Sequence, residues 1–167
     1  MVAKQEQAFV ALVKTHQGIL HKVCRLYAFR EAEREDLFQE ILLQLWRNYR
    51  TYNGKAKIST WMYRVALNTA ISALRKKERR PNLGGDDKLP AGLSESISDP
   101  DIAEKRKFLY QAIAQLSEIE RAIILLYLEE HSYEEISQIM GITPNNVGVK
   151  LNRIKAKLKK KITPHFR

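Results

Sequence analysis

The side chains best suited to chemistry lie near the C-terminus, where amides and cations follow one another at helical spacing. Thr143-Pro144 begins a predicted helix whose first exposed side chains include Asn145 and Asn146, and Arg153 follows two turns later. An asparagine amide can pair with the edge of adenine, and a guanidinium with the edge of guanine, through two hydrogen bonds each. These residue types predict readout of duplex DNA in the major groove.

Basic side chains continue this helix to the end of the sequence. Residues 150–167 include eight lysines and arginines and no acidic residue. Lysine contacts to phosphates would add affinity and salt dependence without sequence choice, although a basic terminus can also be only a solvated face. The predicted duplex contacts are Thr143, Asn145, Asn146, Lys150, Arg153, Lys155 and Lys157, with Gly148 and Val149 also expected on the exposed face.

A second short helix should precede this one across a tight turn. Ser132-Tyr133-Glu134-Glu135 is a capping-box sequence, and the helix should end at Met140 with Gly141 in the left-handed conformation. The pattern indicates a helix-turn-helix, with an ordinary packed helical hairpin as the alternative. The apolar residues spaced to pack at this corner are Ile136, Ile139, Ile142, Val147 and Leu151.

Two further caps and one irregular segment define the rest of the C-terminal half. Asp99-Pro100 should begin a helix that runs to about Leu116, and Ser117-Glu118-Ile119-Glu120 is another capping-box sequence. Residues 81–98 hold three of the seven glycines and two of the five prolines, which is typical of a linker. The predicted fold class is therefore all-α, with two small helical domains, 1–80 and 99–167, joined by a flexible linker, 81–98.

The N-terminal half shows three apolar stripes at helical spacing, and the loop between the second and third combines an aromatic ring with cations. The stripes run from Phe9 to Tyr27, from Leu37 to Tyr49 and from Trp61 to Leu74. We expect Trp61 in the core, whereas the pattern does not decide whether Tyr63 is buried. Unstacked bases are held by aromatic stacking and by cations on the phosphates. Side chains that supply this combination are Tyr52, Lys55, Lys57, Arg64 and the basic run 75–80.

Two motifs in this half occur in a fixed order. Asp36-Leu37-Phe38-Gln39-Glu40 opens the second predicted helix, and Thr60-Trp61-Met62-Tyr63-Arg64-Val65-Ala66-Leu67-Asn68 lies at the start of the third. Followed by a linker and a helix-turn-helix, they resemble the extracytoplasmic-function group of bacterial RNA polymerase sigma factors, which belongs to the sigma-70 family. The resemblance covers nearly the whole chain.

The resemblance implies roles for individual residues. Asp36, Gln39 and Glu40 match the segment that binds core RNA polymerase, although acids in a first helical turn can also simply complement the helix dipole. The loop 52–58 matches the loop that captures a flipped base of the minus-ten element, and Asn68 matches a residue lining that pocket. The C-terminal helix-turn-helix would read the minus-thirty-five element of promoter DNA. Asn145-Asn146-Val147 departs from the common glycine-threonine-valine, so the promoter sequence cannot be borrowed from relatives.

Other classes of function are disfavoured. No catalytic constellation, phosphate-binding glycine loop or cofactor motif is present, so we expect a protein that is not an enzyme and binds no cofactor. Four histidines without ligand spacing predict no metal site, and Cys24 on an apolar stripe is expected in the core. The sequence predicts no membrane insertion and a cytoplasmic location, and the resemblance to the sigma factors implies an anti-sigma partner. The rival interpretations are a stand-alone dimeric regulator and a non-specific nucleic-acid scaffold.

Overall fold

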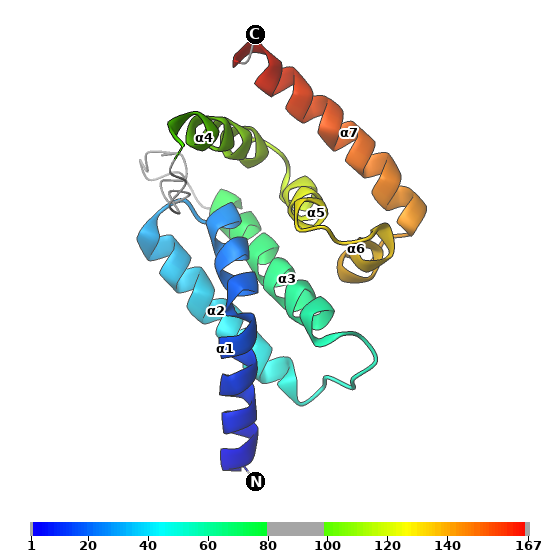
Figure 1. Ribbon diagram of the computed structural model, residues 1–167. Coiled ribbons are helices and arrows are strands. Elements are labelled where there is room, and N and C mark those ends of the chain that lie inside the picture. The colour runs from blue at the N-terminus through cyan, green and yellow to red at the C-terminus, as the bar shows by residue number, and fades with distance from the viewer. Residues whose placement is uncertain (1, 80–98, 166–167) are drawn as a thin grey trace. The chain divides into compact units, whose positions relative to one another are not determined.

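The computed structural model describes residues 2–79 and 99–165, and every regular element in these ranges is helical (Figure 1). The chain divides into two compact units, Met1–Pro81 and Asn82–Arg167. The all-α fold class is therefore confirmed. The expected linker 81–98 lies outside the described residues, and the proposed domain limits stay predictions.

The first unit packs three helices against one another: α1 (Val2–Tyr27), α2 (Glu31–Tyr49) and α3 (Ile58–Arg79). All three pairs of helices are in contact. Fully buried side chains come from each helix and include Leu20, Val23, Ile41, Leu45, Met62 and Leu67. A bundle of this kind leaves one face of each helix for contacts outside the unit.

The buried face of α3 differs from the predicted stripe. Met62, Ala66 and Ala70 are fully buried, whereas Trp61 is only half-buried. The prediction of Trp61 as a core residue was therefore wrong, because the two small alanines turn a different face of α3 toward its neighbours. Tyr63, left open by the sequence, is 4% exposed.

Cys24 is buried, as the apolar stripe predicted. Burial raises the pKa of its thiol to about 12, with Arg34 acting weakly in the opposite direction. A thiol in this state is protonated at neutral pH and therefore a poor nucleophile. Its role is to fill space in the core.

The second unit consists of α4 (Pro100–Ala114), α5 (Glu118–Leu128), α6 (Tyr133–Met140) and α7 (Pro144–Ile162), followed by a short 3-10 turn, Thr163–His165. Helix α7 packs against α4, α5 and α6. The predicted N-caps at Asp99, Ser117, Ser132 and Thr143 all accept a backbone hydrogen bond. Gly141 ends α6 with φ 71°, so the predicted helix-turn-helix is confirmed.

Two details of this unit differ from the prediction. Helix α4 ends at Ala114 rather than near Leu116. Ser132 caps α6, but the carboxylate of Glu135 does not complete a capping box and instead pairs with Nδ1 of His131 at 2.9 Å and accepts from the Ser132 hydroxyl at 3.2 Å. The hydrogen bond to His131 is the largest of the effects that together lower the pKa of Glu135.

Candidate nucleic-acid interface

Helix α7 faces inward with one apolar ridge and outward with polar side chains. The buried ridge consists of Val147, Leu151, Ile154 and Leu158. Asn145 and Asn146 are exposed in the first turn, and Arg153 is exposed two turns later. The Thr143 hydroxyl accepts the N–H of Asn146 at 3.1 Å, so Thr143 caps the helix. Because the first turn contains no acidic residue, its dipole is open to an approaching phosphate.

The structure adds one residue to the outward face and removes another. Asn152 is exposed and follows Asn145 and Val149 at the spacing i, i+4, i+7. The sequence prediction did not include Asn152, although this spacing is visible in the sequence. Gly148 was expected on the exposed face, but it is half-buried, and a Cβ there would lie 3.3 Å from Cε2 of Tyr133. Glycine at this position lets α6 and α7 approach closely.

The predicted cations of α7 fall into two groups. Arg153 is exposed and Lys150 is half-buried, and no side-chain partner within the unit is described for either. Lys155 and Lys157 are bound to α5. The ammonium group of Lys155 donates to the Tyr127 hydroxyl at 3.0 Å and lies 4.2 Å from the centre of that ring. The ammonium group of Lys157 lies 2.8 Å from Oε2 of Glu120.

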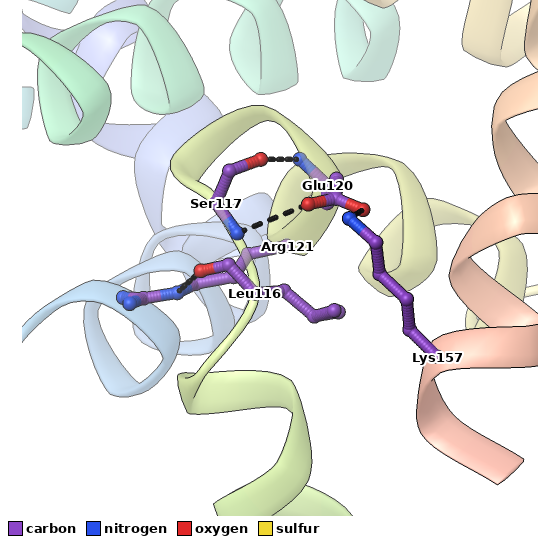
Figure 2. A network of polar contacts seen from close by, with 5 residues as sticks. All are labelled: Leu116, Ser117, Glu120, Arg121 and Lys157. Carbon is purple, nitrogen blue, oxygen red and sulfur yellow. Dashed lines mark hydrogen bonds and ion pairs between the residues drawn. The ribbon is translucent and has the colours of Figure 1, made fainter. Parts of the chain in front are cut away.

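Glu120 is held in place by the start of its own helix. Its N–H donates to the Ser117 hydroxyl and its Oε1 accepts from the Ser117 N–H, each at 3.3 Å, while Lys157 reaches it from α7 (Figure 2). Partial burial raises the pKa of the Glu120 carboxyl, but the hydrogen bonds from Lys157 and Ser117 outweigh this effect and the pKa is lowered. Glu120 is therefore a fixed anion beside α7.

Arg121 closes the corner between α4 and α5 next to this network. Arg121 is 8% exposed. Its guanidinium donates to the carbonyl of Leu116 at 3.0 Å (Figure 2) and to that of Ala114 at 2.6 Å. A cation at the C-terminal end of α4 satisfies carbonyls that the helix leaves unpaired. These hydrogen bonds join the first turn of α5 to the C-terminal end of α4.

The loop between α2 and α3 is braced by aromatic packing. The Tyr52 ring lies 5.2 Å from the Trp61 ring, and its hydroxyl donates to the Ala56 carbonyl. Lys55 and Lys57 are exposed on the same loop. Tyr52 is half-buried, so part of its ring is already covered by Trp61. The arrangement presents two cations on a shaped loop.

Arg64 and Asn68 are exposed one turn apart on α3. Asn68 is ten residues from the start of the helix, which is about 15 Å along its axis from the loop. It lines an open groove of about 630 Å³ between α2 and α3, together with Glu40, Gln44 and Lys76. The structure therefore brings Asn68 close to the predicted polymerase-binding segment.

That segment lies further along α2 than the sequence predicted. Asp36, Gln39 and Glu40 are exposed, while Leu37 between them is buried. The helix begins at Glu31, so the expectation that it opens at Asp36 was wrong. The acidic residues of its first turn are Glu31 and Glu33. Because a helix dipole acts mainly over its first turn, it gives no reason for an acid at Asp36.

No helix within the described residues is long and apolar enough to span a membrane. The chain matches the model of sigma-70 region 2 over residues 12–80 and that of sigma-70 region 4 over residues 109–158. It is 30% identical to the ECF RNA polymerase sigma-E factor of Escherichia coli K12, over 97% of this chain and 90% of the relative. It is 28% identical to the ECF RNA polymerase sigma factor SigW of Bacillus subtilis, over 94% of this chain and 90% of the relative.

Two solved structures share the fold. One is CnrH in complex with the cytosolic domain of CnrY, with TM-score 0.66 and 19% identity over 93% of this chain and 87% of that one. The other is the sigma factor RpoE in complex with the anti-sigma factor NepR from Bartonella quintana, with TM-score 0.67 and 18% identity over 95% of this chain and 96% of that one.

Proposed function

Since the chain belongs to the extracytoplasmic-function subfamily of the sigma-70 factors, we propose that its two units read two separate promoter elements. Membership makes the chain a non-catalytic specificity subunit that directs RNA polymerase to start transcription at promoters. The outward face of α7 is the observation that carries the proposal of two promoter elements. This face has exposed amides and a guanidinium, and the first turn of the helix contains no acidic residue.

The second unit would read the minus-thirty-five element as duplex DNA. Helix α7 would lie in the major groove, with Asn145, Asn146 and Arg153 at base edges. Lys150 and the capped N-terminus at Thr143 would approach the flanking phosphates. Exposure of the two asparagines and the arginine on α7 supports this role.

The first unit would bind the polymerase with α2 and the melted minus-ten element with the loop and α3. Asp36, Gln39 and Glu40 form an exposed polar segment that suits a protein interface. Single-stranded DNA needs cations along its phosphates and polar or aromatic groups for its bases. The residues assigned to the melted strand are Tyr52, Lys55, Lys57, Arg64 and Asn68.

We also propose that an anti-sigma protein binds this chain and that the chain acts in the cytoplasm with the polymerase. Support for the partner comes from CnrH and RpoE, which have the same fold and were solved with CnrY and with the anti-sigma factor NepR. Co-purification of the tagged chain from its own host tests this partner. Recovery of core polymerase with no further stoichiometric protein, under all growth conditions tried, would contradict it.

The deciding experiment is in vitro transcription of fragmented DNA from the genome that encodes the chain, using bacterial core polymerase with and without the protein. New transcript starts that share two spaced upstream motifs are the expected result. A known sigma factor on the same core serves as the positive control. Absence of new starts in that reaction, with a dimer in light scattering and binding to a palindrome, would favour a stand-alone regulator and overturn the proposal.

A further inference from the structure

The two lysines of α7 that contact α5 lie on opposite flanks of its buried ridge. At 100° per residue, Lys155 and Lys157 project roughly 70–90° to either side of the line through Leu151 and Ile154. Their partners, Tyr127 and Glu120, are two turns apart on α5, which is about 10.5 Å. Helix α5 is therefore held from both sides by neighbouring positions of α7.

The apolar ridge packs α7 against its neighbours, but its aliphatic side chains form no directional bonds. Rotation of α7 in one direction would separate Lys155 from Tyr127, and rotation in the other would separate Lys157 from Glu120. Both partners are themselves fixed, since Glu120 belongs to the capping box of α5 and Tyr127 is half-buried. The two contacts thus oppose each other about the helix axis.

We propose that Lys155 and Lys157 are positioning residues that fix the rotation of α7 on α5 and so determine which of its side chains face DNA. The sequence predicted both as direct duplex contacts. The structure gives each of them a partner on α5, although both are exposed like Lys159 and Lys160 on the same helix. This inference rests on the proposed function of α7 as the helix that reads duplex DNA.

The test changes the partners on α5, so that both lysines stay present. Glu120→Gln keeps an acceptor for the Ser117 N–H but removes the ion pair, and Tyr127→Phe keeps the ring but removes the hydroxyl. Each full-length variant is assembled with core polymerase. Binding is measured on a promoter duplex found by the transcription experiment and on the same duplex with its upstream motif scrambled.

We expect each variant to lose about twofold to fivefold of the preference for the intact motif, which is the size of effect that an exposed pair supports. The salt dependence on the scrambled duplex should stay unchanged. Glu104→Gln and Tyr110→Phe on α4 are matched controls for charge and hydroxyl removal and should retain the full preference. Thermal unfolding of all variants checks that the unit remains folded.

A double-mutant cycle separates positioning from direct contact. If Lys157 acts through Glu120, adding Lys157→Gln to Glu120→Gln should cause no further loss of preference, and Lys157→Arg alone should retain it. Tighter binding of Glu120→Gln to both duplexes, with a salt slope steeper by about 0.9, would show that Lys157 had been released onto a phosphate and would overturn the inference. Unchanged preference in both partner variants would overturn it as well. If the unmodified protein bound the intact and the scrambled duplex equally well, that result would instead refute the proposed function.

Discussion

Gly148 lies where α7 passes close to α6, and its replacement by alanine tests how tightly this corner of the helix-turn-helix is packed. A Cβ there would lie 3.3 Å from Cε2 and 3.8 Å from Cδ2 of Tyr133. Alanine is favoured over glycine inside a helix by about 1 kcal/mol. Tyr133 is 42% exposed, so its ring can move outward by the few tenths of an ångström required. Displacing the ring costs part of this gain. We therefore expect Gly148→Ala to stabilise the second unit by about 0.5 kcal/mol.

For a unit of this size, about 0.5 kcal/mol corresponds to a rise in Tm of roughly 2–4 °C. Differential scanning calorimetry of the full chain would measure it. Gly18→Ala is the matched control, because nothing lies within 4 Å of a Cβ at that helical position and the first unit should gain the full effect. Gly141→Ala should destabilise by about 1 kcal/mol, since φ is 71° there. A lower Tm for Gly148→Ala beside a higher one for Gly18→Ala would refute the reasoning.

Three further outcomes are expected. Arg153→Ala should weaken binding of the holoenzyme to the intact upstream motif by about 1–3 kcal/mol, whereas Lys159→Ala should weaken binding to all duplexes alike. Equal losses on intact and scrambled DNA for Arg153→Ala would show that Arg153 does not read bases. Replacing Gln39 and Glu40 together by alanine should reduce association with core polymerase in gel filtration without lowering Tm, and unchanged co-elution would exclude that role. The hydrogen-bonded carboxyl of Glu135 has a lowered pKa, so its stabilisation is complete above the ordinary value of about 4.3 and is lost as the pH falls below it. The Tm of the Glu135→Gln variant should therefore fall less steeply with acidification, as followed by calorimetry between about pH 6 and pH 3.

The second unit could be predicted closely because its helix ends are determined by local chemistry. Ser117 and Thr143 cap helices with hydroxyls that reach only three residues along the chain. Gly141 adopts the left-handed conformation that its place after Met140 required. In each case the residue and its partner are close in sequence, so the local sequence is enough to predict the interaction.

The contacts that the sequence did not predict join residues that are distant in the chain. Lys155 and its partner Tyr127 are 28 positions apart, and Lys157 and Glu120 are 37 apart. No spacing rule links such pairs, and a lysine on a basic helix has the same appearance whether it binds a phosphate or a carboxylate. The inward face of α3 was missed for a different reason. Ala66 and Ala70 contribute little hydrophobicity, yet their small size lets α3 pack closely against its neighbours.

The number of base-reading side chains on α7 limits what the free protein can do. Asn145, Asn146 and Arg153 offer at most a few bidentate pairs at about 1–3 kcal/mol each, while association of two molecules costs about 4–15 kcal/mol. A single DNA-reading helix on a small unit therefore leaves little net binding free energy. Attachment of both units to the polymerase would convert the second contact into an intramolecular one at high effective concentration. Tight, sequence-specific binding of a promoter by the isolated chain would therefore contradict the proposal that its two units read two promoter elements together with the polymerase.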